Sequence, residues 1–387
     1  MQPFVFHNPT KIVFGSQMVK KVGKNTAAYG KKALLVYGQN SIKRSGVYDQ
    51  VTASLSVAGV SWVEHAGVKS NPVLSHVRAG VALAKAEQVD VIVAVGGGSV
   101  LDEAKTIAAG AMTDGDVWDF FNDKAYVKQA LPLITVLTLA ATGSEMNNGG
   151  VITNEDTQQK FNIGSPQLFP KVSILDPCLT YTVPADYNAY SGVDAISHLL
   201  EGYFTSADQV TPLQDRFVEG LIKTIMQSTE QILAEPDHAE ARATMMWAAT
   251  LALNGLSTAG IGGYGFPNHM IEHSLSALYD VAHGAGLSIV MPGWMAYKAQ
   301  QQPAKFAQFV SEVFGCSGGS EQERALYAAE ALKQWFRKIG SPVTLAEEKI
   351  SAQDIPAIAD NATMLAQKWG LKEYNAEVIA DILQRCR

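Results

Sequence analysis

Histidines and acidic residues recur at helical spacing in the second half of the chain. The stretch HMIEHSLSALYDVAHG contains three of the eight histidines, His269, His273 and His283. Further upstream, GVDAISHLLEGY carries Asp194 and His198, whose four-residue spacing puts both side chains on one face of a helix. Taken alone, such a pair is more often a surface pair or a buried histidine. Together, a carboxylate and several imidazoles form a ligand set suited to Fe²⁺, Zn²⁺ or a similar divalent ion.

The separation of the histidines places a condition on any shared ion. His269 and His283 are about 21 Å apart on a single straight helix, which is too far for both to bind one ion. His283 joins only if the chain turns back, and LYDVAHGAG permits a turn with Asp280 and Gly284 as the helix-breaking residues.

The pentapeptide HMIEH also matches the H-x-x-E-H pattern of metallopeptidases. In that alternative, His269 and His273 bind zinc and Glu272 is the general base. A third, acidic ligand would have to come from a downstream helix, and Asp194 and His198 would have no role. Both points count against the peptidase, which is kept as the less favoured alternative.

A glycine-rich turn in the first half suggests a phosphate-binding loop. In DVIVAVGGGSVLDEAK, a predicted strand runs into Gly97, Gly98 and Ser99 and then into a helix, whose N-terminus suits a pyrophosphate. In the alternative interpretation, the segment is a tight turn from strand to helix that binds no phosphate, and Ser99 and Asp102 form a capping box. The literal G-x-G-x-x-G of residues 260–265 follows a helical segment and is predicted to be a loop between helices.

The elements that position these motifs differ between the two halves. Apolar runs at 33–38, 60–64, 90–98, 133–138 and 172–176 alternate with helical segments, which predicts a parallel α/β sheet. After Pro184 the apolar spacing is helical almost throughout. The sequence thus predicts an α/β domain over residues 1–184 and a helical domain over residues 185–387.

Composition excludes several classes of protein. The 387 residues are 47% hydrophobic and 17% charged, as in ordinary globular proteins, and the net charge of −7 argues against nucleic acid or an anionic membrane as partner. We find no signal peptide and no apolar run long enough to span a membrane. Three scattered cysteines fit a reduced, cytoplasmic protein.

Four motifs in register resemble the iron-containing (group III) alcohol dehydrogenases: AVGGGSVLDEAK, ATGSE, GVDAISHLLEGY and HMIEHSLSALYDVAHG. The chain is most similar to their butanol-dehydrogenase-like, NADPH-dependent aldehyde reductase branch. The resemblance implies a dehydroquinate synthase-like fold, with a Rossmann-like dinucleotide-binding domain followed by a helical metal-binding domain. It also implies a small alcohol or aldehyde as substrate, and a homodimer.

The resemblance assigns roles to individual residues. It implies Asp194, His198, His269 and His283 as ligands of Fe²⁺, with Zn²⁺ as the alternative, and His273 as a histidine that faces the substrate and relays a proton. Family members that use NAD carry an Asp where this chain has Gly38, so the missing carboxylate, with Ser41 and Lys43 nearby, predicts NADP(H). Further cofactor-lining positions are Asn71, Gly97, Gly98, Ser99, Asp102, Thr138, Thr142, Asn147 and Lys160.

Two rival functions stand beside the aldehyde reductase and the peptidase. One is a polyol or glycerol dehydrogenase of the same superfamily, and the other is a nucleotide-binding protein without catalysis. The residues do not choose the preferred aldehyde.

Overall fold

The computed structural model describes residues 1–208 and 210–387, which pack into two compact units. One unit, here the α/β unit, comprises residues 7–183 and 236–254. The other, here the helical unit, comprises residues 1–6, 184–235 and 255–387. The predicted division into an α/β dinucleotide-binding domain over residues 1–184 and a helical metal-binding domain over residues 185–387 stays a prediction.

A six-stranded parallel sheet forms the centre of the α/β unit. Its strand order is β1-β8-β5-β4-β2-β3, with bounds Lys11–Phe14 (β1), Lys32–Tyr37 (β2), Ser61–Ala66 (β3), Val91–Gly96 (β4), Leu133–Leu137 (β5) and Val172–Leu175 (β8). β4 reads VIVAVG and is buried at every position, as β-branched residues of a central parallel strand should be. The five strands predicted from the sequence are confirmed. β1 and the antiparallel hairpin of β6 (Gly149–Asn154) and β7 (Gln159–Gly164) were not predicted.

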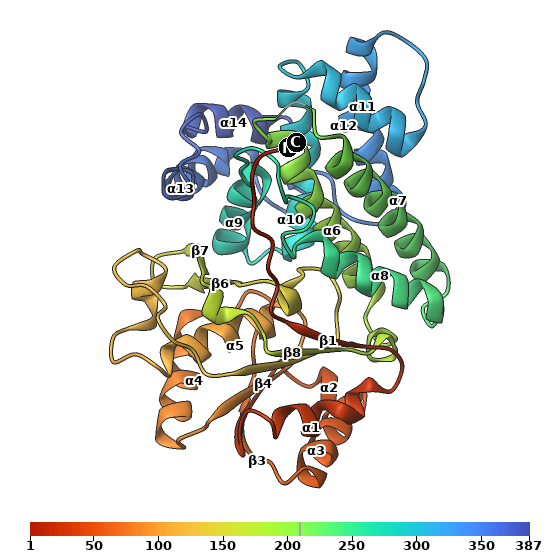
Figure 1. The fold of residues 1–387 in the computed structure, drawn as a ribbon. Helices are drawn as coiled ribbons and strands as arrows, with labels where there is room; N and C mark the ends of the chain where they lie inside the picture. The colour runs from red at the N-terminus through yellow and green to blue at the C-terminus, as the bar shows by residue number, and fades with distance from the viewer. Residues whose placement is uncertain (209) are drawn as a thin grey trace. The chain divides into compact units, whose positions relative to one another are not determined.

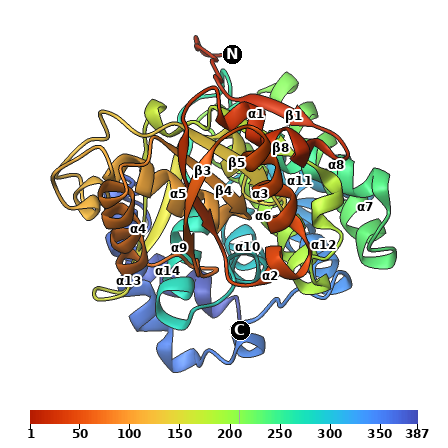
Figure 2. The same cartoon turned by 90° about the horizontal axis from the view of Figure 1, so that it is seen from below.

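Helices cover both faces of this sheet (Figure 1). Helices α1 (Val22–Thr26) and α3 (Val47–Val57) lie on one face, and α4 (Leu74–Ala86) and α5 (Gly98–Gly110) on the other; Figure 2 shows the same two layers from below. The short α2 (Ser41–Arg44) follows β2, and α8 (Ala239–Ala252) also packs in this unit. Val51 and Leu55 of α3 join the alternate residues of β2 and β4 in one apolar core.

The helical unit is built from eight α-helices in its described part. They are α6 (Ala185–Thr205), α7 (Pro212–Ala234), α9 (Pro267–Tyr279), α10 (His283–Lys298), α11 (Pro303–Phe314), α12 (Glu321–Lys338), α13 (Ile355–Lys368) and α14 (Ala376–Gln384). α10 is the central helix and packs against α6, α9, α12 and α14. The predicted fold class, an α/β part followed by an all-helical part, is confirmed. No helix among the described residues is long and apolar enough to cross a bilayer.

Candidate metal and cofactor sites

α6 presents the first two predicted metal ligands from one buried face. The helix begins after Pro184, as predicted, and almost every residue from Asn188 to Phe204 is buried. Asp194 and His198 are one helical turn apart, and His198 Nε2 lies 3.6 Å from Asp194 Oδ1. Neither side chain reaches the surface appreciably. The surface-pair interpretation of these two residues is therefore wrong.

The turn between α9 and α10 places the other two predicted ligands, His269 and His283, near Asp194. α9 ends at Tyr279, the following Asp280 adopts the left-handed conformation (φ 55°), and α10 starts at His283. His269 Nε2 and His283 Nε2 lie 3.8 Å and 3.6 Å from Asp194 Oδ1. Three imidazole nitrogens thus converge on one carboxylate oxygen, and we call these four residues the metal cluster.

Gly284 does not end a helix, contrary to the expectation from sequence. It lies in the first turn of α10, where an added Cβ would stand 2.3 Å from the carbonyl oxygen of Tyr190 in α6. The glycine is needed for the close approach of α10 to α6. Asp280 alone supplies the reversal of the chain.

Two further carboxylates orient His269 and His283 through Nδ1, the ring nitrogen that does not face Asp194. Glu201 Oε1 accepts hydrogen bonds from the backbone N–H of His269 (2.9 Å) and from its Nδ1 (3.0 Å). Glu272 Oε2 accepts from His283 Nδ1, and its Oε1 accepts from Ser276 Oγ. Both carboxylates are fully buried. Each leaves the Nε2 of its histidine facing Asp194, an arrangement typical of outer-shell carboxylates at metal sites.

This arrangement explains the H-x-x-E-H match without a peptidase. A peptidase would need Glu272 to face a metal-bound water, whereas both of its oxygens accept hydrogen bonds from His283 and Ser276. His273 lies in a separate group of possible ligands with Glu272 and His283, whereas Asp194, His198 and His269 form another. Sequence spacing did not reveal Glu201 or Glu272 as orienting residues. A Glu seven residues after Asp194 on a buried helix face was the available signal.

The electrostatics of the cluster fit a bound cation. Burial raises the pKa of Asp194, but the neighbouring imidazoles of His198, His269 and His283 outweigh it and lower the pKa to about 2. Burial lowers the pKa of His198 to about 4. Burial also lowers the pKa of His269, but Asp194 and Glu201 outweigh it and raise the pKa to about 9. The cluster thus holds an ionised carboxylate that attracts positive charge.

Unsatisfied atoms support the same interpretation. Within the described residues, Asp194 Oδ1 and His269 Nε2 are buried and have no hydrogen-bond partner. Buried polar atoms are almost always paired, and a buried carboxylate requires a compensating charge. A divalent ion among these four side chains would satisfy both requirements, so the residues fit the metal that the sequence predicts.

The predicted phosphate loop lies at the carboxyl end of β4. Gly97 precedes α5, and Gly98 and Ser99 are its first residues, whose amides have no acceptor within the helix. A Cβ on Gly98 would stand 2.3 Å from Thr142, so the glycine lets the loop after β5 approach. Thr138, in that loop, donates its N–H to Gly96 O.

The predicted capping box is absent. Gly97, not Ser99, precedes the helix, and Ser99 Oγ donates to the carbonyl of Ser70. Asp102 instead accepts from Ser144 Oγ (2.6 Å) and from the N–H of Val151 (3.1 Å). Asp102 therefore ties α5 both to the segment between β5 and β6, through Ser144, and to β6 itself, through Val151.

Polar contacts hold the remaining predicted cofactor residues of this region. Lys160 Nζ, on β7, donates to Asn71 Oδ1 at 3.0 Å, and both side chains are buried. Asn147 Oδ1 accepts from Lys105 Nζ at 2.9 Å. Lys105 is fully buried and also donates to Ser144 Oγ and Gly149 O. Lys105 lies three residues after Asp102, on the same side of the helix, and that spacing is the signal in the sequence that points to it.

The three positions predicted to bind the cofactor's 2′-phosphate follow β2. Gly38 comes directly after the strand, and Ser41 begins α2 and is exposed. Lys43 Nζ lies 3.6 Å from Glu64 Oε2 and packs over the rings of Tyr37 and Tyr48. The structure therefore pairs Lys43 with Glu64, a contact that the sequence did not predict.

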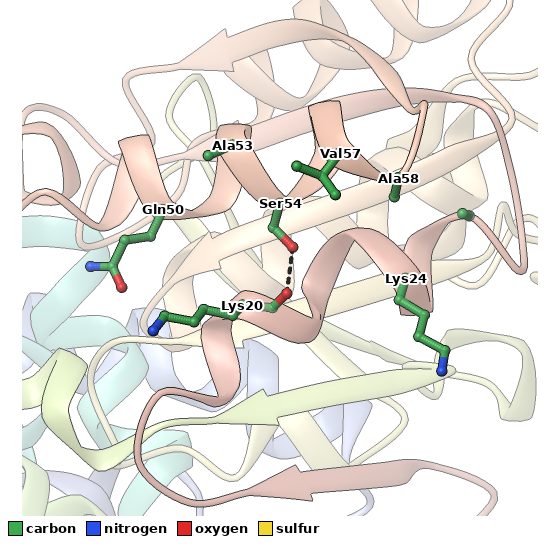
Figure 3. A pocket seen from close by; sticks show the side chains of 8 residues that line it. Lys20, Lys24, Gln50, Ala53, Ser54, Val57 and Ala58 are labelled. Atoms are coloured by element: carbon green, nitrogen blue, oxygen red, sulfur yellow. Dashed lines mark hydrogen bonds between the residues drawn. The ribbon is translucent and has the colours of Figure 1, made fainter.

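A groove of about 680 Å³ lies elsewhere in the α/β unit, between α1 and α3 (Figure 3). Ala53 and Val57 of α3 and the following Ala58 line it from one side, and Lys20 and Lys24 line it from the other side. The carbonyl of Lys20 accepts from Ser54 Oγ at 2.7 Å. None of the predicted site residues lines this groove, so it is not the candidate site.

Comparisons with known proteins agree with the motifs. Residues 9–177 match the family model described as iron-containing alcohol dehydrogenase, and residues 188–386 match the C-terminal model of the Fe-containing alcohol dehydrogenase family. A probable NADH-dependent butanol dehydrogenase of Bacillus subtilis is 44% identical, over 99% of both chains. An NADPH-dependent aldehyde reductase of Escherichia coli is 36% identical, over 92% of both chains.

A solved structure extends the similarity to the fold. The NADH-dependent butanol dehydrogenase A of Thermotoga maritima superposes with a TM-score of 0.95 and is 46% identical, over 100% of this chain and 99% of that one. Both units are therefore matched in sequence and in backbone. The chain belongs to the iron-containing alcohol dehydrogenase family.

Proposed function

We propose that this protein interconverts primary alcohols and aldehydes, with a metal ion held by Asp194, His198, His269 and His283. The observation that carries the proposal is the convergence of three Nε2 atoms on Asp194 Oδ1 within 3.8 Å, with unsatisfied buried atoms at its centre. When bound, a divalent ion supplies Lewis acidity toward the aldehyde carbonyl, and a nicotinamide supplies the hydride. Fe²⁺ is the proposed ion, with Zn²⁺ as the alternative, because this ligand set accepts either.

The chain's own residues supply positioning and proton transfer. Glu201 and Glu272 fix the two imidazoles that they contact, so the ligand atoms keep their direction when an ion is absent. His273 is buried beside His283, with ring centroids 5.7 Å apart, and packs edge-on against Trp369. We propose that a ring nitrogen of His273 delivers the proton that the alcohol product requires.

The proposed cofactor is NADP(H), bound through Gly97, Gly98 and Ser99 and the neighbouring residues described above. The lack of a carboxylate at Gly38 supports the phosphorylated cofactor. The names of the relatives include both NADH and NADPH. In this chain, Glu64 competes with a 2′-phosphate for Lys43. With NADPH, the proposed direction is aldehyde reduction. A homodimer and a cytoplasmic location stay predictions from the sequence.

The test follows the oxidation of NADPH and of NADH by the purified protein with butanal. The assay is repeated after chelation and again after restoring Fe²⁺ or Zn²⁺. Oxidation that is lost on chelation and returns with one ion supports the proposal and identifies the ion. Glycerol with an oxidised nicotinamide is the comparison substrate, because faster turnover there would favour a polyol dehydrogenase. No oxidation of any aldehyde with either ion would contradict the proposal.

A further inference from the structure

A second group of potential ligands lies in the α/β unit, apart from every residue used above. His65 is near the end of β3, His76 is in the first turn of α4, and Glu103 is in the second turn of α5. Glu103 Oε1 lies 3.0 Å from His65 Nε2 and 2.6 Å from His76 Nδ1. The two imidazole rings pack together with centroids 4.1 Å apart. Three elements that are distant in sequence thus direct ligand atoms to one point.

Burial makes this arrangement costly without a further partner. Glu103 is fully buried, and its second oxygen, Oε2, has no hydrogen-bond partner within the described residues. Two hydrogen bonds from the histidines would satisfy Oε1 alone. Leaving a buried carboxylate oxygen without a partner destabilises the folded protein by on the order of 1–3 kcal/mol. A ligand that binds Oε2 would offset this cost.

The histidines are oriented as metal ligands usually are. The Nε2 of His76 is 3.1 Å from the carbonyl oxygen of Ala66, which directs Nδ1 toward Glu103. A ligating histidine commonly donates its other N–H to a backbone carbonyl in this way. Gly80 makes room for the partner ring, since a Cβ there would lie 2.9 Å from His65 Nε2.

We propose that His65, His76 and Glu103 form a second metal site, which binds Zn²⁺. Two imidazole nitrogens and a carboxylate are ligands that Zn²⁺ accepts, and Glu103 Oε2 has no hydrogen-bond partner among the described residues that would compete with a cation. The side chain of His76 is 26% exposed, so water reaches this side of the cluster and completes the coordination. The ion would link β3, α4 and α5, and α5 begins with the proposed pyrophosphate loop. The proposal is independent of the catalytic function.

The test counts zinc ions in the full-length protein. The protein is stripped with a chelator, loaded with Zn²⁺, desalted, and analysed for zinc per chain by mass spectrometry. The wild type should hold two ions. His269→Ala, which removes a ligand of the metal cluster, should hold one, and Glu103→Gln should also hold one. Combining the two substitutions should leave none. His7→Gln is the matched control, because His7 belongs to neither cluster, and it should hold two.

Several outcomes would overturn the proposal. One ion in the wild type and none in His269→Ala would show that only the metal cluster binds zinc. Two ions in Glu103→Gln would show that the ion is elsewhere. Should Glu103→Gln fail to fold, His76→Gln replaces it, because that side chain is partly exposed, and it must likewise lose one ion. A failure of aldehyde reduction would leave these counts unaffected, so the two proposals are tested separately.

Discussion

His269 and Glu201 form a fixed pair in the helical unit, with Nδ1 and Oε1 3.0 Å apart and the backbone N–H of His269 donating to the same oxygen. The backbone contact keeps the carboxylate beside His269, and the imidazole cannot turn without losing its own contact at Nδ1. This pairing sets the direction of Nε2 toward Asp194. The orientation of a ligand therefore depends on a residue that would not touch the metal.

Replacing Glu201 should weaken metal binding without removing a ligand. We expect Glu201→Gln to lower the affinity for Zn²⁺ about 10- to 100-fold, because an outer-shell partner of a ligating histidine is lost. Competition with a chromogenic chelator measures this affinity. Glu373→Gln, at an exposed position, is the matched control and should bind as the wild type does. Equal affinities in both variants would contradict the orienting role.

Gly286 gives a test of Glu272 that leaves both carboxylates in the sequence. A Cβ at this position would stand 2.7 Å from Glu272 Cγ and 2.8 Å from its Oε1. We expect Gly286→Ala to displace Glu272, to reduce metal retention, and to lower the free energy of unfolding by about 1–3 kcal/mol through overpacking. Chemical denaturation and metal analysis measure the two effects.

Gly220 is the matched control for this substitution. It lies inside α7, and an added Cβ would meet nothing within 4 Å. Gly220→Ala should stabilise the protein by about 0.5–1 kcal/mol, since alanine favours a helix interior. A Gly286→Ala protein as stable as this control, with full metal content, would mean that Glu272 is not held tightly.

The ligands could be predicted from the sequence because their spacing has a direct geometric meaning. Asp194 and His198 share a helix face, and the distance along a helix shows that His283 must follow a turn. The partners of these residues could not be predicted in the same way. The orienting roles of Glu201 and Glu272 follow from the contacts of their carboxylate oxygens with the imidazole rings. Those contacts depend on how α6, α9 and α10 pack.

The strands also fall into those that the sequence predicts and those that it does not. β2, β4, β5 and β8 are continuous apolar runs with an unambiguous pattern. β1 carries exposed residues at both ends, and β6 contains two consecutive glycines, so neither has that pattern. The pairing of Lys43 with Glu64 could not be predicted because Lys43 lies on α2 and Glu64 on β3, and their contact depends on how these two elements pack.

The preference for NADPH should depend on the competition for Lys43. Glu64 is 36% exposed and lies 3.6 Å from Lys43 Nζ, so it draws the ammonium group away from an incoming phosphate. We expect Glu64→Gln to raise the ratio of kcat/KM for NADPH to that for NADH several-fold, and Lys43→Ala to lower it. Screening by salt should reduce both effects, because the pair is exposed. Steady-state kinetics with both cofactors measures the ratio.

Lys24→Ala is the control for the loss of a positive charge from this unit. It lines the groove between α1 and α3, and the ratio should stay unchanged. An unchanged ratio in all three variants would mean that neither Lys43 nor Glu64 affects cofactor choice.

Lys105 should make stability depend on pH. Burial lowers its pKa to about 8, from an ordinary value of 10.5, against the opposing charges of Asp102 and Glu145. Above about pH 8 the folded chain loses this proton while the unfolded chain keeps it, so this group favours folding increasingly up to about pH 10.5. Relative to Lys105→Met, the wild type should gain on the order of 3 kcal/mol across that window.

Urea denaturation at a series of pH values measures this gain. Lys31→Met, at an exposed position, is the control and should give a curve parallel to the wild type. A Lys105→Met curve that is also parallel would show that the folded protein does not shift this pKa.

His273 separates proton delivery from metal binding. Its ring lies next to that of His283, but Asp194 Oδ1 is approached by the other three histidines. We expect His273→Ala to keep its full metal content and to reduce kcat for butanal by about 10²–10⁴, the usual contribution of a positioned acid or base.

His7→Ala is the control and should match the wild type in both measurements. Loss of the metal from His273→Ala would instead make His273 a ligand, whereas an unchanged kcat would leave the proton to be delivered from elsewhere. The pH profile of the remaining activity decides between direct delivery and a structural effect, because only direct delivery removes the ionisation of His273 from the profile.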